Sequence, residues 1–214
     1  MTIRAERCGP TRGAAVVVLH GCGGFSTFDH QLAADLPTYG IATLYVDYFA
    51  PTPPPGRRGF CNVWTRPARL FWKWQRVAAD AARVLRQRGY AHVGVVGWSL
   101  GAGVALATAE DVHVFDAVAA FSAIASPLTL EQARSLPPSM FLDGGLRDIV
   151  PPANARALYA AARHGGVAAA MYIYPDGTHD WAGRQGVAGR SRAAAFLRRF
   201  LEPIRRARSF ETAD

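Results

Sequence analysis

The chain has 214 residues and half of them are hydrophobic, which suits a single globular domain over residues 1–214. Its 14 prolines and 21 glycines are too few for a disordered or collagen-like chain. The net charge of +8 comes almost wholly from arginine, since Lys73 is the only lysine. Without a recognisable binding module we expect no nucleic-acid and no membrane partner.

Apolar runs and helical patterns alternate along the chain. The run AAVVVL at 14–19 is apolar throughout, as in a strand buried on both faces. Further strands are predicted at 41–46, 92–96, 117–121, 139–142 and 169–174, and helices at 27–39, 67–88, 99–109, 153–163 and 190–206. This alternation predicts an α/β fold, with a mostly parallel sheet and helices on both faces. No insertion, including the long loop at 47–65, is long enough for a separate lid domain.

The most informative segment is Gly97-Trp98-Ser99-Leu100-Gly101, which stands between a predicted strand and a helix of small residues. This G-x-S-x-G pattern is typical of a nucleophile elbow, a turn so tight that a Cβ atom at either glycine would collide with neighbouring backbone. The turn exposes the serine hydroxyl, and the N-terminus of the following helix favours developing negative charge. The segment predicts Ser99 as a catalytic nucleophile.

A serine nucleophile needs an adjacent base, and in this kind of fold the acid and then the histidine follow the serine along the chain. His179 lies in a loop after the last predicted strand, whereas a solvated helix end accounts for His164. Asp143 and Asp148 both follow the preceding strand. We favour Asp148, which lies in the loop beyond that strand, and expect it to orient His179 and to stabilise its charged form.

An oxyanion hole is expected where the first apolar strand ends, in the sequence HGCGG at 20–24. Backbone N–H groups of such a turn can point toward the site, and the residue after the nucleophile supplies another N–H group. We assign the two donors to Cys22 and Leu100. His20 precedes the turn and is interpreted as a structural residue.

Together these segments resemble the dienelactone hydrolase family of α/β-hydrolases. The matching segments are VVLHGCGG at 17–24, LYVDYF at 44–49, GWSLG at 97–101, DIVP at 148–151 and YPDGTHDW at 174–181. The resemblance spans nearly the whole chain and implies the α/β-hydrolase fold. It also implies that Ser99, Asp148 and His179 form the catalytic triad. We expect no cofactor and no metal ion.

Two positions depart from the founding members of that family, which carry a cysteine nucleophile and a glutamate after the first histidine. Here these positions hold Ser99 and Gly21. The changes agree with each other, because a serine activated by His179 does not need a glutamate that controls a thiol. They favour a general ester or lactone hydrolase over an enzyme dedicated to dienelactones.

Several aromatic and arginine side chains are candidates for substrate binding, because ligand sites are typically apolar with a few polar groups. The loop at 47–65 starts where a strand ends and can wall a pocket. Family members that bind a substrate carboxylate use an arginine shortly after the catalytic histidine. The candidates are Tyr48, Trp64, Trp98, Trp181, Arg57 and Arg184. For each aromatic residue, a place in the core is the alternative.

The sequence therefore predicts a serine hydrolase that cleaves small carboxylic esters or lactones through an acyl-enzyme. Thioester hydrolysis or perhydrolysis on the same triad is the alternative within enzymes. A non-catalytic binding protein with the hydrolase fold is the alternative outside them, which the filled triad positions disfavour. The expected partner is a small-molecule substrate, and the expected assembly is a monomer or a small homo-oligomer.

The chain has an odd number of cysteines, and no two of them form a C-x-x-C motif. They are Cys8, Cys22 and Cys61. A domain of this size does not need a disulfide, so we predict free thiols in a reducing compartment. A Cys22–Cys61 bridge stays open as the alternative, since both residues belong to loops near one end of the sheet. The N-terminal residues lack an apolar stretch of signal-peptide length, and a soluble cytoplasmic protein is expected.

Overall fold

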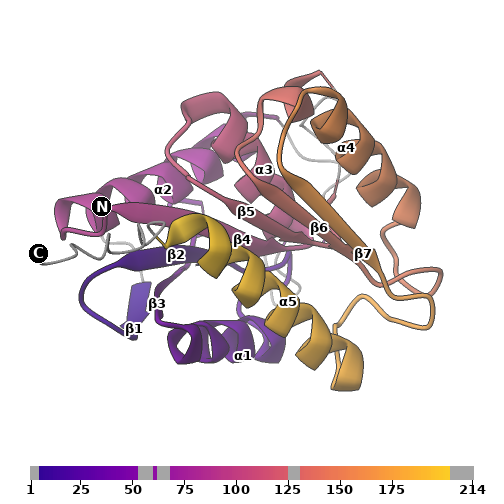
Figure 1. The fold of residues 1–214 in the computed structure, drawn as a ribbon, viewed down its shortest axis with the longest axis horizontal. Coiled ribbons are helices and arrows are strands. Elements are labelled where there is room, and N and C mark those ends of the chain that lie inside the picture. Colours follow the sequence, from indigo (N-terminus) through magenta and orange to yellow (C-terminus); the bar gives the residue numbers. More distant parts are fainter. Residues whose placement is uncertain (1–4, 53–59, 62–67, 125–130, 203–214) are drawn as a thin grey trace, which may run out of the picture.

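The computed structural model describes residues 5–52, 60–61, 68–124 and 131–202, which form one seven-stranded sheet with helices on both faces (Figure 1). The strands are β1 (Ala5–Cys8), β2 (Ala14–Leu19), β3 (Ile41–Val46), β4 (His92–Trp98), β5 (Val118–Phe121), β6 (Ser139–Asp143) and β7 (Ala169–Ile173). Their order across the sheet is β1-β3-β2-β4-β5-β6-β7. Neighbouring strands are parallel except for β1 and β3, which confirms the predicted α/β architecture.

The helices form a layer on each face of the sheet. They are α1 (Thr27–Asp35), α2 (Ala68–Gln87), α3 (Leu100–Val112), α4 (Pro152–His164) and α5 (Gly183–Leu201), with 3-10 turns at Leu36–Tyr39 and Gln132–Ser135. Helices α1 and α5 cover one face, and α2, α3 and α4 cover the other (Figure 1). Each face has its own hydrophobic cluster, so the sheet is buried on both sides.

Strand β2 illustrates how the sequence builds this core. Ala15, Val17 and Leu19 belong to the cluster beneath α2, α3 and α4. Val16 and Val18, which alternate with them, belong to the cluster beneath α1 and α5. Successive side chains of a strand point to opposite faces, and here both faces are covered, so every position must be apolar.

Strand β1 and the start of helix α5 differ most from the sequence prediction. Strand β1 was not expected; it pairs antiparallel with β3 at the sheet edge, where Arg7 and Cys8 are exposed, so it lacks the pattern of a buried strand. Helix α5 begins at Gly183 rather than at residue 190. Glycine disfavours a helix, but a Cβ atom on Gly186 would lie only 1.8 Å from the carbonyl oxygen of Trp181. A side chain at position 186 would therefore clash with the backbone of Trp181, which explains why glycine occurs inside this helix.

The carboxyl ends of the parallel strands lie along one edge of the sheet, which is where open α/β sheets bind their ligands. The segments that follow β2, β4, β5, β6 and β7 meet at this edge. Within the described residues, no helix combines the length and hydrophobicity needed to span a bilayer.

Candidate active site

Ser99 lies on the sharp turn between β4 and α3. Its φ of 55° and ψ of −116° are strained for a residue that has a Cβ atom. A Cβ atom on Gly97 would lie 2.3 Å from the carbonyl oxygen of Gly101, and one on Gly101 would lie 2.3 Å from that of His20. The Ser99 N–H group donates to the carbonyl oxygen of Phe121 at 2.8 Å. The turn thus has the close backbone packing that requires both glycines of the motif.

His179 and Asp148 reach Ser99 from the ends of β7 and β6. His179 Nε2 lies 3.0 Å from Ser99 Oγ, and His179 Nδ1 lies 2.6 Å from Asp148 Oδ1. A carboxylate only accepts, so we assign the hydrogen to Nδ1, which leaves Nε2 to accept from the Ser99 hydroxyl. The Asp148 side chain is fully buried, whereas the His179 side chain keeps 17% of its surface exposed. The three side chains form the continuous line expected of a nucleophile, a base and an orienting acid.

Asp148 is surrounded by hydrogen-bond donors. Its Oδ1 also accepts from the Val150 N–H group at 2.8 Å, and its Oδ2 accepts from Ser122 Oγ at 2.5 Å and from the Gly144 N–H group at 3.1 Å. Burial by itself would raise the pKa of Asp148, but the hydrogen bonds from His179, Ser122 and Val150 outweigh it and lower the pKa below 3.8. An ionised Asp148 can stabilise positive charge on His179.

A second carboxyl group, Asp143, lies at the end of β6. Its Oδ1 accepts from the Gly145 N–H group at 2.8 Å, whereas Oδ2 has no partner among the described residues. Burial, reinforced by the charge of Asp148, raises the pKa of Asp143 to about 6. Of the two acids weighed from the sequence, Asp148 is the one hydrogen-bonded to His179.

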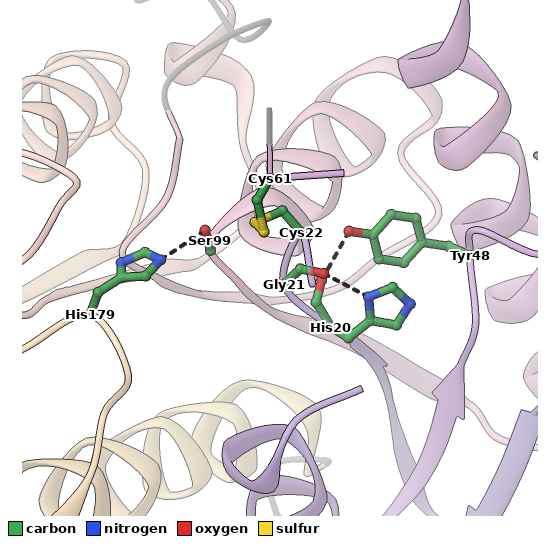
Figure 2. The surroundings of a disulfide bond; sticks show 7 residues. All are labelled: His20, Gly21, Cys22, Tyr48, Cys61, Ser99 and His179. Carbon is green, nitrogen blue, oxygen red and sulfur yellow. Dashed lines mark hydrogen bonds between the residues drawn. A yellow bond between two sulfur atoms is a disulfide. The ribbon is translucent and has the colours of Figure 1, made fainter. Parts of the chain in front are cut away.

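The turn after β2 lies beside Ser99, and the side chains of His20 and Tyr48 support it on the side away from Ser99 (Figure 2). Tyr48 Oη donates to the His20 carbonyl oxygen at 2.9 Å, and the buried His20 ring pairs with the Gly21 carbonyl oxygen through Nδ1 at 2.8 Å. His20 and Tyr48 also stack, with ring centroids 4.3 Å apart. No described residue accepts a hydrogen bond from the N–H group of Cys22 or Leu100. The assignment of these two groups to an oxyanion hole remains a prediction.

A cavity of about 460 Å³ opens over Ser99 and His179. Its apolar lining residues are Phe25, Trp98, Ile124, Ile149, Val150 and Pro151. Ser26 and Asn154 add polar groups, and none of the described lining residues is Asp, Glu, Lys or Arg. A site of this size and composition suits a small, largely apolar molecule.

The aromatic candidates for substrate binding separate into two groups. Trp98 lines the cavity, and its Nε1 donates to the His179 carbonyl oxygen at 2.8 Å. Tyr48 and Trp181 are instead buried to 1% exposure or less and do not line the cavity. The prediction that they bind substrate is wrong, because the aromatic core beneath the site encloses both rings.

The remaining candidates for substrate binding are Arg184, Arg57 and Trp64. Arg184 is exposed in the first turn of α5 and does not line this cavity, and its role in binding a substrate carboxylate remains a prediction. Arg57 and Trp64 lie outside the described residues, and their roles remain predictions.

Cys22 and Cys61 form a disulfide that lines the cavity close to Ser99 (Figure 2). The prediction of free thiols is wrong for these two residues, and the alternative bridge is correct. Cys8 is an exposed thiol. The Phe60 N–H group donates to the Cys22 carbonyl oxygen at 2.5 Å, which brings the two chain segments together. The expectation of a reducing compartment rested on free thiols and loses that support.

Two residues that hold the loops of the site, Gln185 and Ser122, are not among those predicted from the sequence. Gln185 binds both backbone groups of Thr178, accepting from its N–H group at 2.8 Å and donating to its carbonyl oxygen at 3.0 Å. Ser122 donates to Asp148. No motif marks either residue, although Ser122 directly follows a predicted strand at the ligand-binding edge of the sheet, which was a usable signal.

A parallel sheet that presents a strained serine after one strand, with an acid and a histidine from later strands, defines the class of α/β-hydrolases. The profile of the dienelactone hydrolase family matches residues 3–206. The chain therefore belongs to the dienelactone hydrolase family and is a hydrolase. No curated protein matches the sequence at a significant level.

Solved structures share this fold at low sequence identity. A dienelactone hydrolase from Anabaena variabilis is 18% identical, with a TM-score of 0.72 over 94% of this chain and 93% of its own. A monoacylglycerol lipase from Paleococcus ferrophilus is 15% identical, with a TM-score of 0.72 over 94% of this chain and 100% of its own. Est1E from Butyrivibrio proteoclasticus is 12% identical, with a TM-score of 0.70 over 91% of this chain and 94% of its own. These likenesses establish the fold alone.

Loss of the disulfide is expected to destabilise the protein. The bridge closes a loop with a sequence separation of 39, for which chain entropy gives a stabilisation of about 4 kcal/mol. Cys61→Ser should therefore lower the free energy of unfolding, measured by urea denaturation, and a thiol reductant should lower that of the wild type to match. Cys8→Ser is the control and should leave stability unchanged. Equal stabilities of Cys61→Ser and Cys8→Ser would contradict the bridge.

The buried Asp143 should make stability depend on pH. Its pKa is higher in the folded state than its ordinary 3.8, so its contribution to stability is full below pH 4 and is lost as pH rises through about 6. Relative to wild type, Asp143→Asn should gain stability of the order of 2–3 kcal/mol between pH 4 and pH 8, from urea denaturation at both pH values. Asp111→Asn, at an exposed position of α3, should show no such gain. A parallel pH response of Asp143→Asn and wild type would refute the assignment.

Proposed function

We propose that this hydrolase cleaves small carboxylic esters or lactones through an acyl-enzyme on Ser99. The observation that carries the proposal is the line of hydrogen bonds from Asp148 through His179 to Ser99, at 2.6 Å and 3.0 Å. The line ends on a strained serine that borders the cavity. Such an arrangement activates a hydroxyl that is a weak nucleophile by itself.

In the first half of the reaction, His179 Nε2 takes the proton of Ser99 Oγ as that oxygen attacks the ester carbonyl carbon. The resulting imidazolium is stabilised by the Asp148 carboxylate, which does not itself take the proton. The tetrahedral intermediate collapses when His179 gives this proton to the departing alkoxide oxygen. An alcohol leaves and the acyl group remains on Ser99; for a lactone, alcohol and acyl group stay joined.

In the second half, water attacks the acyl group on Ser99, with His179 again acting as base. The carboxylic acid departs when the proton returns to Ser99 Oγ. In both halves the carbonyl oxygen carries negative charge, and we assign its two donors to the N–H groups of Cys22 and Leu100. Their lack of an acceptor among the described residues supports this assignment.

The size and lining of the cavity favour small and mostly uncharged substrates. Its volume of about 460 Å³ accommodates a small ester, and its lining by Phe25, Trp98 and Ile149 suits apolar acyl or alcohol groups. No described lining residue supplies an arginine or lysine for a substrate carboxylate. The proposed substrate class is therefore neutral esters and lactones.

Replacing Ser99 by alanine should abolish turnover while the fold persists. The variant lacks the attacking oxygen, so hydrolysis of p-nitrophenyl butyrate should fall by at least about 10³-fold, with an unchanged circular dichroism spectrum. A fluorophosphonate probe should label the wild type and not the variant.

Ser135→Ala, in an exposed 3-10 turn, is the matched control and should keep both the rate and the labelling. Undiminished hydrolysis by Ser99→Ala would overturn the proposed nucleophile. A thioester turned over much faster than the matched oxoester would overturn the assignment of esters as the substrate class.

A further inference from the structure

Most of the strained backbone conformations outside glycine lie around the buried side chain of Asp148. Among the described residues other than glycine, positive φ angles occur at Ser99, His113, Ser122 and Trp181. His113 caps the end of α3 in a left-handed conformation that helix ends often adopt. The other three belong to one hydrogen-bonded network. Conformations of this kind persist only where the surrounding structure requires them, and they are frequent at functional sites.

The hydroxyl group of Ser122 lies between one hydrogen-bond donor and one hydrogen-bond acceptor. Trp181 Nε1, which can only donate, lies 2.9 Å from Ser122 Oγ. Asp148 Oδ2, which only accepts when ionised, lies 2.5 Å from the same oxygen. The single hydroxyl hydrogen must therefore point at Asp148. Ser122 and Trp181 are 0% and 1% exposed, so bulk water does not compete for these bonds.

The position of this pair is fixed by packing. The Trp181 ring meets the Phe121 ring at 90°, with centroids 4.9 Å apart, and a Cβ atom on Gly189 would lie 2.7 Å from the Trp181 ring. The Ser122 N–H group donates to the Leu142 carbonyl oxygen at 2.7 Å. The Ser122 hydroxyl group therefore lies where three segments meet, namely the ends of β5 and β6 and the loop after β7.

We propose that Ser122 is a positioning residue for the triad and that Trp181 directs its hydrogen bond. This inference rests on the proposed function. By occupying Oδ2 of Asp148, Ser122 leaves Oδ1 to face His179, and it draws negative charge toward Oδ2. Ser122 thereby sets both the orientation of the His179 ring and the strength with which Asp148 holds its Nδ1–H group.

The test replaces Ser122 by alanine and follows ester hydrolysis as a function of pH. Loss of the hydrogen bond loosens the carboxylate, so kcat should fall on the order of tenfold with KM unchanged. The charge that remains on Oδ1 should favour the protonated imidazole, so the acidic limb of kcat/KM should move to higher pH by about half a unit. A purely structural role would lower the amount of folded protein without moving this limb.

The His179 Nδ1 proton resonance in the NMR spectrum provides a readout that needs no substrate. It should move downfield in Ser122→Ala. Trp181→Phe keeps the serine but frees its hydroxyl to rotate, and should shift both the resonance and the acidic limb in the same direction by less. Ser139→Ala, at a buried serine of β6 whose hydroxyl donates to the Pro137 carbonyl oxygen, is the matched control and should shift neither.

The outcomes separate this inference from the proposed function. An unmoved resonance and an unmoved acidic limb in Ser122→Ala would overturn the role of Ser122, even with normal ester hydrolysis in the wild type. A shifted resonance in a protein that hydrolyses no ester would support the role of Ser122 and overturn the proposed function instead.

Discussion

The hydrogen bond of 2.6 Å between His179 Nδ1 and Asp148 Oδ1 joins two loops that leave the sheet at β6 and β7. A fully buried carboxylate can face that histidine only because other groups offset the cost of its burial. The N–H groups of Gly144 and Val150 and the Ser122 hydroxyl supply that compensation. Gly144 is needed for the close approach, since a Cβ atom there would lie 2.5 Å from Asp148 Oδ2. The base is therefore oriented by a carboxylate that two backbone N–H groups and one serine hydroxyl hold in place.

The opposite wall of the site depends on the turn after β2. Gly21 stands where founding members of the family have a glutamate, and a Cβ atom at this position would lie 2.7 Å from the Trp98 ring. Trp98 thus occupies the space into which such a side chain would project, and it also donates to the His179 carbonyl oxygen. Glycine at position 21 and tryptophan at position 98 are therefore compatible with each other at this wall of the site. The Cys22–Cys61 disulfide links the same turn to the segment at residues 60–61.

Much of the site could be predicted from the sequence because its geometry follows from the order of the strands. The elbow at Ser99 is a local pattern of glycines, and His179 and Asp148 follow strands whose carboxyl ends must share one edge. The disulfide and the burial of Tyr48 and Trp181 depend instead on contacts between distant segments. Ser122 was missed for the same reason, because its partners Asp148 and Trp181 are adjacent only in the folded chain.

The proposed mechanism requires that Ser99 carries the acyl group during turnover. Rapid-quench mass spectrometry of the wild type mixed with excess p-nitrophenyl butyrate can detect that species. We expect a transient mass increase of one butyryl group, located on the peptide that contains Ser99 and absent after the substrate is exhausted. Steady hydrolysis of the ester with no acylated species, or with the acyl group on another residue, would contradict it.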